Sequence, residues 1–192
     1  MCGIAGIYHL ETAKPVDPAR LRQMLQPMQH RGPDGSGEWT APGVGLGHLR
    51  LSIIDIAGSP QPMASDDVLV TLTYNGEIYN FRELRAELED RGHRFRTSGD
   101  TEVIIAAWRQ WGPDCLSRLN GMFAFAIHDH QRGCLFLARD RLGIKPLHYV
   151  RLSDGSVAFA SELKGLLRNP LLRQEANLTA IEDFLAFGYV PD

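Results

Sequence analysis

The sequence predicts an α+β fold, in which antiparallel sheets pack against helices. Several pairs of β-rich segments are separated by short polar turns, which is typical of hairpins and not of the helical crossovers that parallel strands need. Amphipathic helical segments lie between these pairs and after them. The chain has 192 residues, of which 44% are hydrophobic and 22% charged, so it can bury a core without disulfides or structural metals.

The first half of the chain predicts strands around one interrupted helix. Cys2–His9 is typical of a buried strand, and the next apolar residues share one helical face: Leu21, Met24, Leu25 and Met28. Pro27 lies inside that pattern, so we expect the helix to kink or end early there. The turn-forming run HRGPDGSG predicts a loop over His30–Gly37. Strands follow over Val44–Ile56, with breaks, and over Val68–Tyr74.

The second half predicts two helices, two hairpins and two more helices. Asn80 is placed to cap one helix, with Glu83 three residues later and Gly92 at its end. Asp100 or Thr101 is placed to cap the next, which runs to about Trp111. The expected hairpins are Met122–Asp129 with Cys134–Arg139, and Leu147–Arg151 with Ser156–Ala160. The last helical stretches are Glu162–Arg168 and Leu178–Phe187.

Composition argues against several classes of protein. Twenty Lys and Arg against 23 Asp and Glu give a net charge of −3, so no basic surface for nucleic acid is expected. No apolar stretch is long enough to cross a membrane, and the N-terminus MCGIAGIYHL lacks the features of a secretory signal. Three cysteines without a CxxC motif favour a reducing, cytoplasmic setting. Nucleotide-loop and zinc-protease motifs are absent from the sequence.

Cys2 is the strongest candidate for a reactive side chain. A free cysteine is usually a small buried hydrophobe, which is the simplest interpretation. Removal of Met1, however, would leave Cys2 with a free α-amino group, whose pKa in model peptides is about 7.7–8.0. Such an amine can take the thiol proton and return it to a leaving amine, so an N-terminal cysteine carries its own base. That chemistry suits acyl transfer and amide hydrolysis.

Three other positions could complete an amide-hydrolysing site. Asn75-Gly76 is either a tight turn or an oxyanion site built from a side-chain amide and an unhindered backbone N–H. Arg50 is either a solvated strand residue or a fork for an α-carboxylate. Asp100 is either a helix cap or a partner for an α-ammonium group. His128 and His130 share a strand face, but no third metal ligand accompanies them, so we expect no metal site.

Together these segments resemble one known family. The runs that carry the resemblance are MCGIAGIY, HRGPDGSG, HLRLSIIDI, YNGEIYNF, SGDTEVI, LNGMFAFAIHD, ARDRLGIKPLHY, FASELKGLL and FLAFGYVPD. In this order and spacing they are similar to the glutamine amidotransferase domain of glutamine-hydrolysing asparagine synthetases, which is of the class II, N-terminal-nucleophile type. The resemblance covers residues 2–192. It implies a four-layer αββα sandwich of two antiparallel sheets and a glutaminase that makes glutamate and ammonia.

The resemblance also implies roles for individual residues. It implies that Met1 is removed, that Cys2 is the nucleophile, and that Asn75 and Gly76 bind the oxyanion. Arg50 matches the residue that holds the glutamine α-carboxylate, and the following backbone would line that site: Leu51, Ser52, Ile53 and Ile54. Glu77 and Asp100 match the residues that take the α-amino group. Two positions depart from the commonest pattern, Leu49 and His148, and neither is one of these site residues.

The family's second half, an ATP-pyrophosphatase synthetase domain, is absent from this chain. Its Ser-Gly-Gly-x-Asp-Ser loop does not occur here. We therefore expect no cofactor for these residues, since ATP and magnesium belong to that domain. The expected partners are glutamine and the synthetase domain, which the apolar helix near the C-terminus would contact, with pairing of two copies as the alternative. Two other functions stay open: an amidotransferase with a different carboxylate acceptor, and a non-catalytic module of the same fold.

Overall fold

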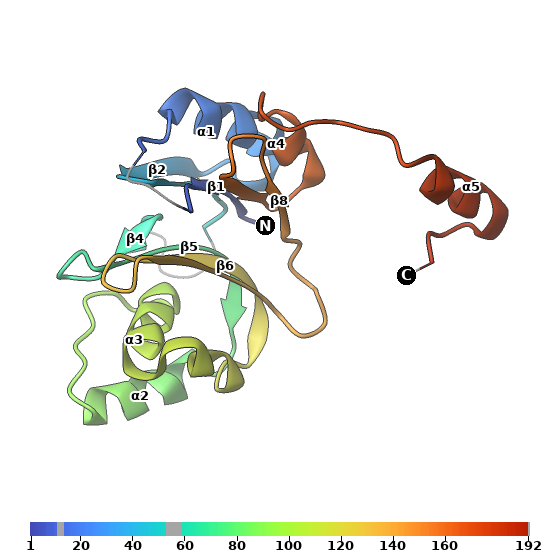
Figure 1. The fold of residues 1–192 in the computed structure, drawn as a ribbon. Helices are drawn as coiled ribbons and strands as arrows, with labels where there is room; N and C mark the ends of the chain where they lie inside the picture. Colours follow the sequence, from blue (N-terminus) through green and yellow to red (C-terminus); the bar gives the residue numbers. More distant parts are fainter. Residues whose placement is uncertain (11–13, 53–58, 192) are drawn as a thin grey trace.

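Two antiparallel sheets lie face to face, and helices cover the outer face of each (Figure 1). The computed structural model describes residues 1–10, 14–52 and 59–191. The layers follow one another as helix, sheet, sheet and helix (Figure 1). The predicted α+β class and the four-layer arrangement are therefore confirmed.

The first sheet places the N-terminal strand at its centre. Its strands have the order β2-β3-β1-β9-β8, and all neighbours are antiparallel. They are β1 (Gly3–Tyr8), β2 (Gly35–Ala41), β3 (Val44–Arg50), β8 (His148–Arg151) and β9 (Val157–Ala160). Strand β1 pairs with β3 along its whole length and with β9 from Ala5 to Tyr8. Cys2, directly before β1, is therefore held at the end of the central strand.

The second sheet is built around one long pair of strands. Its order is β4-β5-β6-β7, formed by β4 (Met63–Ala64), β5 (Val70–Ile78), β6 (Gly121–Asp129) and β7 (Cys134–Arg139). Between the two sheets lies a small apolar cluster of Ile4, Val44, Leu46, Ala124, Ala126 and Phe159. Within the first sheet, Gly6 leaves room for the ring of its cross-strand partner Phe159, since a Cβ at Gly6 would lie 2.3 Å from that ring. The absence of a side chain on β1 thus lets Phe159 join the cluster between the sheets.

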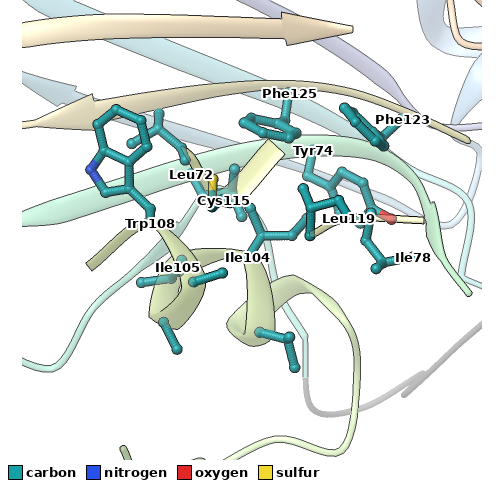
Figure 2. Packing of buried hydrophobic residues seen from close by; sticks show 14 of the residues in the cluster. Leu72, Tyr74, Ile78, Ile104, Ile105, Trp108, Cys115, Leu119, Phe123 and Phe125 are labelled. Carbon is teal, nitrogen blue, oxygen red and sulfur yellow. The ribbon is translucent and has the colours of Figure 1, made fainter. Parts of the chain in front are cut away.

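Helices cover the outer faces and bury most of the core. The first sheet is covered by α1 (Pro18–Leu25), the 3₁₀-helix η1 (Gln26–Arg31) and α4 (Leu163–Leu167). The second is covered by α2 (Phe81–Asp90), α3 (Thr101–Trp111) and the 3₁₀-helix η2 (Gly112–Ser117). Figure 2 shows Ile104 and Trp108 of α3 in one packed cluster with Leu72 and Phe125 of the second sheet. The last helix, α5 (Leu178–Phe187), projects away from these layers (Figure 1).

Most predicted elements are present, and Pro27 has a simple explanation. Helix α1 ends at Leu25, and the chain continues as η1 with Pro27 in its first turn. A missing N–H costs nothing there, because the first N–H groups of a helix have no intrahelical partner. The four residues of the predicted apolar face are all buried: Leu21, Met24, Leu25 and Met28. The predicted kink is therefore a change of helix type.

Three local predictions were wrong. The loop predicted over His30–Gly37 ends early, because Gly35–Gly37 pair with β3 as the start of β2. Strand β5 begins at Val70 and continues to Ile78, so it passes through the Asn75-Gly76 pair without turning. The Asn80 side chain does not cap α2: its amide donates to the Arg118 carbonyl at 2.9 Å and its oxygen accepts from the Asn120 N–H.

The core beneath the second sheet gives a direct stability test. Leu72 is fully buried against α3, so Leu72→Ala removes packed methyl groups and leaves a cavity. We expect a loss of about 2–5 kcal/mol in the free energy of unfolding, measured by urea denaturation. Leu142→Ala is the control, because Leu142 is 85% exposed. Equal losses from the two substitutions would contradict the packing described.

Candidate active site

One pocket collects the predicted site residues at the end of the two sheets. It is lined by Cys2 from the N-terminus, by Arg50, Leu51 and Ser52 after β3, by Asn75, Gly76 and Glu77 of β5, and by Asp100 before α3. These residues come from both sheets and from a helix start, so only the tertiary fold brings them together. Ile53 and Ile54, also predicted to line this site, lie outside the described residues.

The Cys2 thiol is held against the backbone that follows β3. The Leu51 N–H points at the Cys2 sulfur, with the nitrogen 3.4 Å away, and the sulfur lies 3.5 Å from the Leu51 carbonyl oxygen. The side chain is partly exposed to the pocket, and all three cysteines of the chain are free thiols. Cys2 is therefore not the packed core hydrophobe that the simplest interpretation of the sequence allowed.

Arg31 fixes the main chain of Cys2. Its Nε donates to the Cys2 carbonyl at 2.9 Å, and its Nη1 donates to the Glu162 carboxylate at 2.7 Å. His30 and Lys164 contact the same carboxylate, at 3.0 Å and 2.9 Å. Burial would raise the pKa of Glu162, but hydrogen bonds from Arg31, Lys164 and His30 lower it to about 2. The carboxylate thus stays ionised and anchors Arg31 behind the thiol.

Asn75 presents a buried amide without a partner. Among the described residues its Nδ2 has no hydrogen-bond acceptor, although the side chain is almost fully buried and lines the pocket. Buried donors are normally paired, so this amide is available for an oxygen that enters the pocket. The neighbouring Gly76 is confined by the next strand, since a Cβ there would lie 2.3 Å from the Met122 carbonyl.

Asp100 is buried at the start of α3, and it is not used as a helix cap. One of its carboxylate oxygens accepts from the Tyr74 hydroxyl at 2.7 Å and from the Ile78 N–H at 2.9 Å. Burial, together with the nearby Asp100 carboxylate, raises the pKa of Tyr74 well above its usual value, so the phenol remains a donor. Asp100 and Glu77 therefore place two acidic side chains in the wall of the pocket.

The run HRGPDG braces the end of β3. The Asp34 carboxylate accepts from the Ser52 N–H at 2.8 Å, and the Asp34 N–H donates to the Arg50 carbonyl at 3.0 Å. Gly32 packs against this segment so closely that a Cβ would lie 2.2 Å from the Leu49 carbonyl carbon. The motif therefore supports the position of Arg50 through the backbone.

The pocket also contains residues that sequence analysis did not assign. They are Met1, Ser59, Gln61, Tyr74, Thr101, Met122 and Lys145. Lys145 follows a loop that the Asp140 carboxylate organises by accepting from the N–H groups of Leu142, Ile144 and Lys145. These bonds lower the pKa of Asp140, although its burial acts in the opposite direction. The run ARDRLGIKPLHY marks this loop in the sequence. That its lysine lines the pocket can be recognised only in the folded structure.

The described residues offer neither a metal-binding cluster nor a membrane-spanning helix. Within residues 1–10, 14–52 and 59–191, no three His, Cys, Asp or Glu side chains are grouped so that they could hold a metal ion. No helix in that same part of the chain is long and apolar enough to span a bilayer.

Comparison with known proteins agrees with the fold. The chain belongs to the family described as the glutamine amidotransferase domain, whose family model matches residues 1–192. The fold is that of the N-terminal-nucleophile amidotransferases: glutamine phosphoribosylpyrophosphate amidotransferase from Bacillus subtilis superposes with a TM-score of 0.70 at 25% identity, over 86% of this chain and 43% of that one.

Within this family the chain is similar to glutamine-hydrolysing asparagine synthetases. It is 40% identical to asparagine synthetase 3 of Bacillus subtilis over 98% of its own length and 31% of that protein. It is 39% identical to asparagine synthetase B of Escherichia coli, over 99% of this chain and 33% of that protein. The chain thus spans about a third of the length of the curated relatives it matches.

A buried histidine beside the pocket makes stability depend on pH. His48 of β3 is fully buried, with Nδ1 3.3 Å from the Thr73 hydroxyl. Burial, helped by the charge of Arg50, lowers the pKa of His48 from 6.5 to about 3. The unfolded chain therefore binds a proton below pH 6.5 that the folded chain excludes, so stability falls as the pH drops from 6.5 towards 3.

We expect His48→Gln to weaken this dependence. Between pH 7 and pH 5 the parent chain should lose about 2 kcal/mol more unfolding free energy than His48→Gln, as measured by urea denaturation. The Glu162 carboxylate begins to contribute only below its ordinary value of 4.5, so this pH window avoids it. Equal losses in the two proteins would show that His48 is not held neutral in the folded state.

Proposed function

We propose that this chain hydrolyses glutamine to glutamate and ammonia, with Cys2 as the nucleophile after removal of Met1. One observation supports it most strongly: the Cys2 thiol, the unpaired Asn75 amide, Arg50 and Asp100 line a single pocket. Each group matches one need of amide hydrolysis: a nucleophile, an oxyanion donor and two grips on the α-groups of the amino acid.

Substrate binding would use the basic and acidic side chains that line the pocket. The Arg50 guanidinium matches the α-carboxylate of glutamine, with the backbone of Leu51 and Ser52 beside it. Asp100 and Glu77 match the α-ammonium group. Held by both groups on its α-carbon, the substrate directs its γ-amide to the Cys2 sulfur. Positioning of this kind converts a bimolecular attack into an intramolecular one.

The proposed reaction proceeds through a thioester. The free α-amine of Cys2 takes the thiol proton, and the sulfur attacks the γ-carbonyl carbon to form a C–S bond. The resulting oxyanion accepts hydrogen bonds from the Asn75 amide and the Gly76 N–H. The protonated α-amine gives its proton to the amide nitrogen, and the C–N bond breaks to release ammonia. Water then attacks the γ-glutamyl thioester, which releases glutamate and restores the thiol.

We infer that the whole protein uses this ammonia to make asparagine in the cytoplasm. Support comes from the asparagine synthetases to which the chain is similar, and from the three free thiols, which suit a reducing compartment. ATP and magnesium would be needed only by the synthetase part. Helix α5 presents exposed apolar side chains, including Phe184 at 57% and Leu185 at 79%, as a surface for that part to cover.

Blocking the N-terminus tests the proposed mechanism. A tag joined to Cys2 turns its amine into an amide without basicity, so we expect glutaminase activity to fall at least about 100-fold. The tag carries a protease site whose cleavage leaves Cys2 first, and cleavage should restore activity in the same sample. Ammonia release reports activity, mass spectrometry reports the N-terminus, and circular dichroism reports folding. A folded, blocked protein that turns over at the cleaved rate would refute the N-terminal mechanism.

Arg50→Lys tests substrate recognition. Lysine keeps the charge but loses the two-pronged contact with a carboxylate, so KM for glutamine should rise roughly tenfold with little change in kcat. Arg173→Lys is the matched control, because the Arg173 side chain is 84% exposed and pairs with Glu175 at the surface. An unchanged KM in Arg50→Lys would remove Arg50 from the carboxylate site.

A further inference from the structure

Lys145 is a buried cation in the wall of the candidate site. Its relative exposure is only 5%, and its main chain is fixed on both sides. The Lys145 N–H donates to Asp140 at 2.9 Å, and its carbonyl accepts from the Arg139 Nε at 2.8 Å. The position of the lysine is therefore set by its loop and does not depend on a bound substrate.

The Lys145 ammonium points at the residue that processing would remove. Among the described residues, the one acceptor that it reaches is the Met1 sulfur, at 3.3 Å. A thioether is a weak acceptor, and a buried charge normally has a strong partner. The methionine side chain connects that sulfur to the nitrogen of Cys2, so standard bond lengths place the two nitrogens within about 10 Å. Loss of Met1 thus leaves a cation beside a newly created amine.

We propose that Lys145 is a positioning charge, which keeps the freed α-amine of Cys2 unprotonated at neutral pH. The inference rests on the proposed function, in which this amine must be neutral to accept the thiol proton. Two like charges in a partly buried pocket repel one another, so the amine binds its proton less readily beside the ammonium. Lys145 itself transfers no proton and forms no bond with the substrate.

Other charged or titratable groups line the same pocket or bind Cys2. The charged side chains are Arg31 of η1, Arg50 after β3, Glu77 of β5 and Asp100 before α3, and the titratable ones are the Tyr74 phenol and the Cys2 thiol. The charge of Arg31 is balanced by Glu162 at 2.7 Å. The charge of Arg50 is offset by the acidic side chains of Glu77 and Asp100 in the same pocket, and glutamine brings both an α-carboxylate and an α-ammonium to these groups. Lys145 is the cation whose contact disappears when Met1 leaves.

The pH dependence of glutamine hydrolysis tests this role. For unit charges about 10 Å apart near a protein surface, the interaction is worth roughly one pH unit. In processed Lys145→Met protein, the acidic limb of kcat/KM should therefore move up by about one unit. Activity should fall roughly fivefold to tenfold at pH 6.5 and recover at pH 9. A purely structural role would lower the rate at all pH values and would leave the profile in place, which would overturn the proposal.

Two variants control for charge and for lysine loss elsewhere. Lys145→Arg keeps the cation and should keep the parent pH profile. Lys14→Met removes a lysine from the exposed segment before α1 and should also leave the profile unchanged. A shifted profile in Lys145→Arg would show that the length of the side chain, and not its charge, is what matters, and would also overturn the proposal.

The amine can be titrated directly without relying on activity. In the Cys2→Ala background, trace acetylation of the N-terminal amine by acetic anhydride is followed against pH by mass spectrometry of the N-terminal peptide. Lys145→Met should shift this titration upward by about one unit. No shift would overturn the proposal even if the enzyme is active. If this shift is found but the processed parent chain, with Cys2 intact, releases no ammonia, the role of Lys145 is supported and the proposed function is overturned.

Discussion

The site depends on one constraint: the strand that starts the chain lies at the centre of its sheet. Strand β1 pairs with β3 on one side and β9 on the other, so its first residue cannot move independently of the sheet. Arg31 extends this restraint to Cys2 by binding its carbonyl, and Glu162 restrains Arg31 in turn. Chain termini usually fray. Here strand pairing and the bond from Arg31 restrain the residue next to the terminus, which suits the nucleophile role proposed for Cys2.

The second sheet supplies the Asn75 amide and the support for Asp100. Strand β5 passes the pocket and brings Asn75 into it, while its neighbour Tyr74 reaches Asp100 at the start of α3. Because Asp100 also accepts from the Ile78 N–H, one carboxylate joins the strand to the helix that covers it. The apolar cluster between the sheets holds the two halves at a fixed separation. Packing and polar contacts therefore act together to set the geometry around the thiol.

The sequence predicted the fold class well because hairpins and amphipathic helices are local patterns. The hairpin of Met122–Asp129 with Cys134–Arg139 and the helix over Leu178–Phe187 needed only neighbouring residues to be recognised. Predictions failed where pairing with a distant segment decided the outcome. Gly35–Gly37 form a strand only because β3 lies beside them. The Asn80 side chain does not cap α2, because it forms hydrogen bonds with the segment between η2 and β6.

The same distinction applies to the pocket. Cys2, Asn75, Arg50 and Asp100 were found because their motifs resemble a known family, and local pattern alone left each of them with an ordinary explanation. Lys145 was missed, since nothing near it in the sequence indicates that it meets the first residue of the chain. Asp100 was expected to cap a helix, and its bond to Tyr74 depends on how α3 packs beneath β5.

The position of Met1 has a consequence for how such a protein would be activated. Its side chain occupies the pocket wall and contacts Lys145, and its carboxyl group is joined to the nitrogen that the proposed mechanism needs as a base. In that mechanism the initiator methionine acts as a propeptide of a single residue. The newly made chain would be a zymogen, and one irreversible cleavage would switch it on for its lifetime.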